Sequence, residues 1–235
     1  MYKLTVRANQ NPESIGSQVA ATRMLIKCGL VAGPLYLLIF AMQIYLRPEF
    51  HFTREPSLLS IGPLGWIQIG NDILGGLLVL AGAQGMRRVV RRSKSDFWGP
   101  LLLQVFGFCQ IGVGIFVVDP VRPSAIMTVH GTLHIVLGGI GFVALMAACF
   151  VFVRAFLLWK RKGWAIYCAI VGLMFLAAFL SAARIDRQHR SSIQVFLNLI
   201  FILEWIWLSS ISAQYSQQRL SDPFKRDTLV QTGAS

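Results

Sequence analysis

Charged residues are scarce in this chain of 235 residues: they make up 14% of it, whereas hydrophobic residues make up 55%. Soluble globular domains carry roughly 25% charged residues. The chain therefore lacks the polar surface that a water-soluble domain of this length requires. Cysteine is also scarce, and the 4 cysteines form no C-x-x-C pair and lie within or beside apolar stretches. This pattern disfavours a disulfide framework and a zinc knuckle.

Acidic residues are outnumbered by basic ones, 10 against 22, which gives a net charge of +12. Such an excess can indicate a nucleic-acid partner, but no nucleic-acid recognition motif accompanies it. The basic residues instead follow the ends of apolar stretches, where they orient membrane spans and contact anionic lipids. We therefore expect a lipid bilayer and no nucleic acid as the surroundings of this protein.

Long apolar runs are what the chain does have, and each is close to the roughly 20 helical residues that cross a bilayer. The pattern predicts an all-α fold, a transmembrane bundle of six helices over residues 25–213, between polar tails 1–24 and 214–235. The expected spans are 28–46, 66–86, 99–118, 130–153, 164–182 and 193–213. Their small residues, among them Gly76, Gly107, Gly138 and Gly139, predict close helix packing.

Lys and Arg alternate in density along the connections between these spans. Most lie in the two tails and in the second and fourth connections, while the other three connections hold fewer. Because basic loops stay in the cytoplasm, both termini are predicted to be cytoplasmic, in a multi-pass protein of the plasma membrane.

Five ionisable residues lie in the spans or at their expected outer mouths. They are Asp72, Asp119, His130, His134 and Glu204. A charge inside a bilayer costs several kcal/mol unless it pairs or faces water. We therefore expect an outward-facing polar pocket, with Asp72, Asp119, His130 and His134 in one cavity and Glu204 near the middle of the membrane.

The spacing of His130 and His134 places two imidazoles one turn apart on a helix face. With Asp119 as a third ligand, the group could bind zinc. The alternative is a hydrogen-bonded cap of the fourth helix. For Asp72 the alternative to a site is hydrogen bonding between helices, and Glu204 is either a proton carrier or a structural acid.

Two segments resemble the DUF998 family of bacterial and archaeal membrane proteins: residues 56–71 (PSLLSIGPLGWIQIGN), and 114–120 (GIFVVDP) followed by 130–134 (HGTLH). The resemblance implies a six-helix bundle with a polar loop before the second span, an Asp-Pro ending the third and a His-Gly opening the fourth. The matching positions are Ser57, Ser60, Gly62, Gly65, Asn71, Asp119, Pro120, His130 and His134. The chain departs from the family pattern at Asp72, where an apolar residue is usual, and we interpret Glu204 in the same way. The family brings no established activity.

Three functions compete on these grounds. The first is a pocket that binds a lipid or small amphiphile, with candidates Ser57, Ser60, Asn71, Asp72, Asp119, His130, His134 and Glu204. The second is a metal-dependent intramembrane hydrolase or transferase acting on lipid headgroups, with zinc at Asp119, His130 and His134. The third is a proton-coupled transporter, which would need polar residues from Glu204 to the inner leaflet. The sequence assigns no catalytic residue and no oligomeric state.

Overall fold

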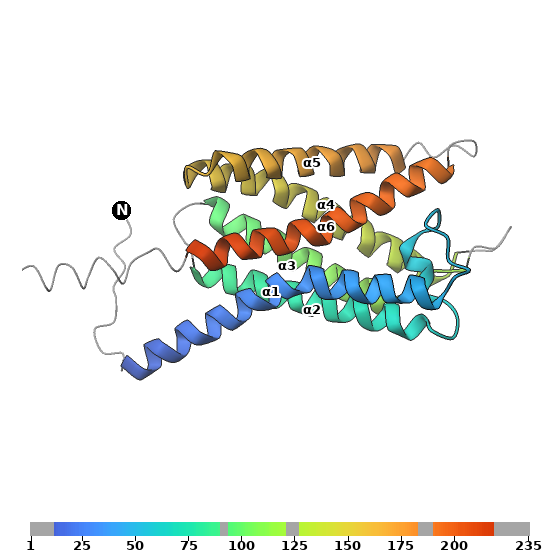
Figure 1. The fold of residues 1–235 in the computed structure, drawn as a ribbon, viewed down its shortest axis with the longest axis horizontal. Coiled ribbons are helices and arrows are strands. Elements are labelled where there is room, and N and C mark those ends of the chain that lie inside the picture. Colours follow the sequence, from blue (N-terminus) through green and yellow to red (C-terminus); the bar gives the residue numbers. More distant parts are fainter. Residues whose placement is uncertain (1–11, 90–93, 121–126, 183–189, 219–235) are drawn as a thin grey trace, which may run out of the picture.

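The computed structural model describes residues 12–89, 94–120, 127–182 and 190–218. Its long helices form one elongated bundle (Figure 1). They are α1 (Pro12–Leu46), α2 (Gly65–Val89), α3 (Lys94–Ile115), α4 (Val129–Leu158), α5 (Lys162–Ala182) and α6 (Arg190–Gln218), with a short 3-10 helix, η1 (Pro56–Ser60), between α1 and α2. All six long helices are long and apolar enough to cross a membrane, which confirms the predicted all-α, six-span architecture.

Several helix boundaries differ from the expected spans, among them the start of α1 and the end of α3. α1 begins at Pro12, inside the segment expected to be a polar tail. Proline fits the first turn of a helix, and Ala20 and Ala21 favour helical backbone beyond it. α3 ends at Ile115, so Asp119 lies in the segment after the helix and not in its last turn. Asp119 precedes a proline, and that position disfavours helical backbone.

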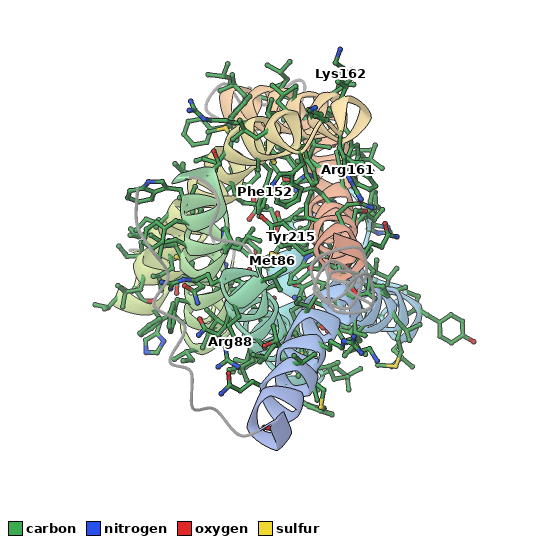
Figure 2. The ribbon with its side chains drawn as sticks, turned by 90° about the vertical axis from the view of Figure 1, so that its left-hand side faces the viewer. Met86, Arg88, Phe152, Arg161, Lys162 and Tyr215 are labelled. Carbon is green, nitrogen blue, oxygen red and sulfur yellow. The ribbon has the colours of Figure 1, made fainter. Side chains whose placement is uncertain are left out.

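Consecutive helices pack side by side, and α1 closes the bundle against α6. α5 packs chiefly on α4 and more sparsely on α6. α1 begins and α6 ends at the same end of the bundle, which we call the termini end; the opposite end is the η1 end (Figure 1). Arg88, Arg161 and Lys162 lie at the termini end (Figure 2). This placement agrees with the expected cytoplasmic side, although orientation in the membrane stays a prediction.

Glycines allow close helix contacts at some of the expected positions. A Cβ on Gly76 would lie 2.6 Å from the carbonyl oxygen of Gly107, so α2 and α3 touch through their backbones. Gly33 brings α1 equally close to α6, where its N–H donates to Ser209 Oγ at 3.0 Å. Gly138 and Gly139 do not make close helix contacts. A Cβ on Gly138 would have Val113 Cγ2 as its nearest neighbour, at 3.9 Å, and a Cβ on Gly139 would have no neighbour within 4 Å. The sequence prediction of tight packing was wrong for these two.

The core near the termini end is aromatic. The Phe152 ring lies 5.8 Å from Trp207 and 5.9 Å from Tyr215, centroid to centroid. Phe152, Tyr215 and Met86 lie in the interior between the helices (Figure 2). Toward the η1 end the buried side chains of α1 and α2 include several polar ones. That part of the bundle contains the candidate site.

Candidate functional site

Asp72 of α2 is the centre of a buried polar network. Its side chain is 4% exposed. One carboxylate oxygen, Oδ1, accepts hydrogen bonds from the Tyr36 hydroxyl of α1 at 2.6 Å, from Gln68 Nε2 at 2.9 Å and from Gln110 Nε2 of α3 at 2.8 Å. Buried polar groups in a membrane protein must find partners inside the protein. The network meets this requirement and ties three helices to one oxygen atom.

A second row of contacts orients the donors to Asp72. Gln68 Nε2 also donates to the Tyr36 hydroxyl at 2.7 Å, and Gln68 Oε1 accepts from Gln43 Nε2 at 2.8 Å. The Tyr36 ring stacks on the indole of Trp205 with centroids 3.8 Å apart and planes inclined by 13°. The carboxyl group of Asp72 is therefore supported from α1, α2 and α3, and through Tyr36 from α6.

This network borders a hollow of about 170 Å³, which we call the inner cavity. α1, η1, α2, α3, α4 and α6 contribute to its walls, and none of its lining residues comes from α5. The lining residues are Tyr36, Pro56, Ser57, Gln68, Asp72, Phe106, Gln110, Val113, His134, Gly138, Phe142, Phe201 and Glu204.

Glu204 of α6 lines the inner cavity and is 6% exposed. Within the described part of the chain its carboxyl group has neither a hydrogen-bond partner nor an ion pair. The adjacent Trp205 and the nearby Trp207 are fully buried. Burying a carboxyl group without a partner is costly. Glu204 therefore presents an unused acceptor to the inner cavity.

His134 of α4 lines the same cavity and is 8% exposed. Its Nδ1 lies 2.8 Å from the carbonyl oxygen of Phe116 and 3.2 Å from that of Val113. A carbonyl oxygen only accepts, so Nδ1 must carry the proton of these bonds. In the neutral ring this tautomer makes Nε2 an acceptor. The end of α3 thus sets the orientation of the imidazole.

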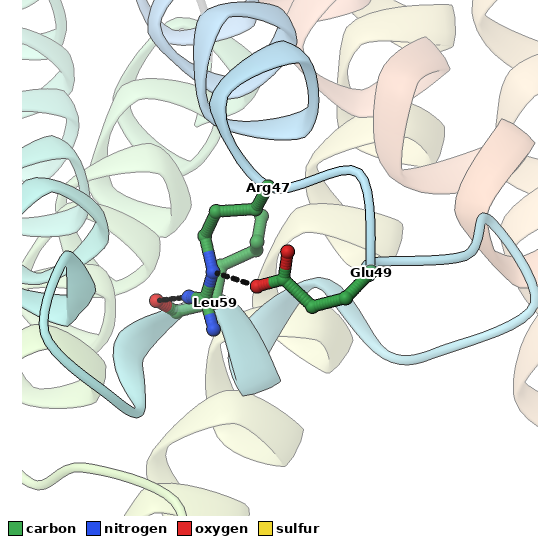
Figure 3. Close-up of polar contacts among 3 residues, drawn as sticks. All are labelled: Arg47, Glu49 and Leu59. Carbon is green, nitrogen blue, oxygen red and sulfur yellow. Dashed lines mark hydrogen bonds and ion pairs between the residues drawn. The ribbon is translucent and has the colours of Figure 1, made fainter.

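The connection between α1 and α2 folds over the η1 end. Arg47 donates to Glu49 at 3.1 Å and to the carbonyl oxygen of Leu59 at 2.9 Å, which holds η1 against the end of α1 (Figure 3). Asn198 Nδ2 of α6 donates to the carbonyl oxygens of Phe52 at 2.6 Å and Arg54 at 2.9 Å. These contacts attach the connection to α6 and place η1 against the inner cavity.

A second hollow of about 500 Å³, the outer pocket, lies on the other side of η1. Its lining residues are Arg47, Thr53, Arg54, Glu55, Leu58, Ile61, Pro120 and Gln194. Glu55 and Leu58 line the outer pocket, while Pro56 and Ser57 line the inner cavity. A single 3-10 turn therefore separates the two hollows.

Asp119 holds Thr128, the N-cap residue of α4, and does not line the inner cavity. Its Oδ2 accepts from the Thr128 N–H at 2.7 Å and its Oδ1 from the Thr128 hydroxyl at 2.6 Å. Thr128 Oγ1 in turn accepts from Gly131 N at 3.1 Å. The hydrogen bonds from the Thr128 hydroxyl and N–H lower the pKa of Asp119, and the charge of His130 adds to this effect. A Cβ on Gly131 would lie 2.1 Å from Asp119 Oδ2, so the cap requires glycine there.

The predicted zinc ligands do not converge. Asp119 directs both oxygens to Thr128, His134 lines the inner cavity, and His130 is exposed beside the Phe116 ring at 5.5 Å between centroids. No group of three or more His, Cys, Asp or Glu residues in the described ranges could hold a metal ion. The reason is local: α3 ends before Asp119, and the carboxylate is used in the cap.

The inner cavity thus brings together Ser57, Asp72, His134 and Glu204 among the predicted pocket residues. Ser60 and Asn71 are not among the residues that line it. Ser60 Oγ donates to the Ser57 carbonyl at 2.6 Å, and Asn71 Nδ2 donates to the Tyr36 carbonyl at 3.2 Å.

Sequence reasoning missed Tyr36 and Gln110, although a glutamine amid the apolar residues of α3 could have indicated Gln110. It also missed Thr128, although threonine directly before a helix is a common N-cap.

Comparisons with known proteins found one relationship. No curated protein and no solved structure matches the chain significantly. A family model described as "Protein of unknown function (DUF998)" matches residues 30–214, a region that includes η1, the Asp119 cap and all or most of each long helix except the first part of α1. The chain therefore belongs to the DUF998 family, as its motifs predicted.

Proposed function

We propose that the protein binds a lipid or another small amphiphile and holds the polar headgroup in the inner cavity. The observation that carries this proposal is the convergence of Asp72, His134 and Glu204, from three helices, on one hollow of about 170 Å³. A water molecule occupies roughly 30 Å³ in the liquid. The inner cavity therefore has room for a few waters or for one small headgroup.

The mixed lining supports an amphiphile. Three phenylalanine rings, Phe106, Phe142 and Phe201, stand beside the polar side chains. The cavity also lies among helices that are apolar enough to cross a membrane. A ligand with a polar head and an apolar chain meets both kinds of surface, and its headgroup would supply the partner that Glu204 lacks.

The position of η1 suggests the route of entry. Ser57 faces the inner cavity and Glu55 the outer pocket, so a headgroup that passes η1 moves from one hollow to the other. The basic-residue pattern predicts that this end faces outward. We therefore expect the ligand to come from the outer leaflet.

The α2–α3 interface favours binding over transport. Below Gln110, the backbones of Gly76 and Gly107 are in contact. The next polar group along this interface, Gln104 with Gln84 and Arg87, lies beyond that contact, toward the termini end. The polar residues of these two helices therefore form two separate groups and not a continuous path.

A matched pair of glycine substitutions on α4 tests the proposal. Gly138 lines the inner cavity, and only Val113 Cγ2 lies within 4 Å of its Cβ position, at 3.9 Å. Gly138→Leu should therefore fill the cavity without displacing a helix. Gly139→Leu makes the same chemical change at an exposed position with open space around it.

Native mass spectrometry of the purified proteins should detect copurified lipid on the wild type and on Gly139→Leu. Occupancy should fall at least tenfold in Gly138→Leu. Equal lipid occupancy in both variants, with unchanged helical content, would show that the inner cavity is not the binding site.

A further inference from the structure

We infer that the inner cavity selects a primary ammonium group, so that the amphiphile is an amine; this rests on the proposed binding role and names its headgroup. The inference follows from three features of the cavity: more free acceptors than free donors, carboxyl groups without a basic partner, and aromatic walls.

Acceptors outnumber donors among the hydrogen-bonding groups that remain for a ligand; the donors left are the Ser57 hydroxyl and the second hydrogen of Gln110 Nε2. The hydroxyl of Tyr36 and the amides of Gln68 and Gln110 direct hydrogens to Asp72. The carboxyl group of Glu204 has no partner in the described residues, and the Nδ1–H bond of His134 makes its Nε2 an acceptor. A ligand that supplies donors complements such a cavity.

Among the described residues, the lining contains two carboxyl groups and no lysine or arginine. Asp72 and Glu204 are both buried. The one ion pair in the described ranges, Arg47 with Glu49, lies in the α1–α2 connection. A buried carboxylate is stable only with a compensating charge or hydrogen-bond donors. A cationic headgroup would supply both.

The shape and the aromatic rings favour an organic cation. Phe106, Phe142 and Phe201 line the cavity, and ring faces attract ammonium groups. A primary ammonium has three N–H donors, which correspond to acceptors on α2, α4 and α6. A trimethylammonium group has no N–H to offer, and its three methyl groups would need more of the roughly 170 Å³.

The test uses the full chain in nanodiscs of phosphatidylglycerol, which contains no amine. Three probes share one alkyl chain: n-octylammonium, n-octanol and octyltrimethylammonium. Affinity is measured from the rise in the thermal unfolding temperature with probe concentration. We expect n-octylammonium to bind the wild type at least tenfold more tightly than the other two probes.

Glu204→Gln should lower the affinity for n-octylammonium at least tenfold and leave the affinity for n-octanol unchanged. Glu49→Gln removes an exposed carboxylate in the α1–α2 connection and is the matched control, for which no change is expected. Asp72→Asn is the second variant, with the same expected direction, in case Glu204→Gln does not fold.

Equal affinity for the ammonium and the alcohol, or an unchanged affinity in both variants, would overturn the inference while leaving amphiphile binding intact. Competition by sodium or potassium at equal concentration would also overturn it, in favour of an inorganic cation. Failure of the binding role itself shows differently: no probe would bind, and Gly138→Leu would retain as much lipid as Gly139→Leu.

Discussion

Two aspartates near the η1 end, Asp72 and Asp119, have opposite roles. Asp119 is partly exposed, and both of its oxygens accept from one residue, Thr128, nine positions away. Asp72 is buried, and one of its oxygens accepts from side chains of three helices beside a cavity. The source of the donors distinguishes them: a local donor makes a helix cap, while donors from several helices make a site.

The two aspartates also differ in their relation to the family pattern. Asp119 and His130-Gly131 match the pattern that the resemblance implies, and the structure explains them through the cap of α4. Asp72 departs from that pattern, yet it forms the centre of the buried network. The ammonium selectivity that we infer rests on Asp72 and Glu204, where we expect the chain to depart from the family pattern, and on His134, which matches it.

The largest expected effect concerns topology, because both aspartates face outward only if the termini are cytoplasmic. Reporter fusions at Lys94, Val121, Arg161 and Gln188 should report inside, outside, inside and outside in turn. Each reporter gives an all-or-none signal. The reverse order would place the inner cavity in the cytoplasmic half and would remove the proposed entry from the outer leaflet.

Next in size is the effect of removing the central acceptor. Asp72→Ala should destabilise the protein by about 2 kcal/mol, because the donors of Tyr36, Gln68 and Gln110 lose their shared acceptor in a buried site. Asp72→Asn keeps one carbonyl oxygen and should lose less than half as much. Unfolding in mixed detergent micelles measures both values. Equal losses would mean that the carboxylate oxygen is not what holds the network together.

The sequence predicted the six spans better than it predicted the inner cavity. Apolar run length predicted six spans, because the thickness of the bilayer constrains every helix in the same way. Counting residues also placed Asp72 and Glu204 within the second and sixth spans, where the helices contain them. The cavity itself was not, because Tyr36 and Gln110 come from other helices and their rotation about the helix axis depends on packing.

The three candidate zinc ligands do not converge, for a similar reason. The four-residue spacing of His130 and His134 placed both side chains on one helix face. That spacing does not show which neighbouring residue each side chain contacts. The contact of His134 with the Phe116 carbonyl and the capping of Thr128 by Asp119 depend on where α3 ends. That boundary came three residues earlier than the apolar pattern predicted.

A smaller effect is expected from adding one methyl group on α4. Gly139→Ala should stabilise the protein by about 0.5–1 kcal/mol, because alanine favours helix and the position is open. Gly131→Ala should lose this gain and unfold no later than the wild type, since its Cβ would displace Asp119 from the cap. Thermal unfolding of both variants in one detergent makes the comparison. Equal stabilisation would show that the contact between Gly131 and Asp119 can relax without cost.

The smallest expected effect is the pH dependence of the Asp119 cap. Because the hydrogen bonds from Thr128 lower the pKa of the folded carboxyl, the folded state favours the carboxylate. The stabilisation is therefore fully present above the ordinary aspartate pKa, about 4, and is lost as the pH falls through the lower folded value. The unfolding temperature of the wild type should exceed that of Asp119→Asn at pH 5.

That difference should shrink below about pH 4, where the wild-type carboxyl takes up its proton. The effect is small because Asp119 is a single charge near water. In a Thr128→Ala background the difference should be smaller at every pH, since the hydroxyl that contributes most to the lowered pKa is absent. A difference that grows as the pH falls would mean that Asp119 is held in its protonated form, and the contrast with a local, charged cap would then be wrong.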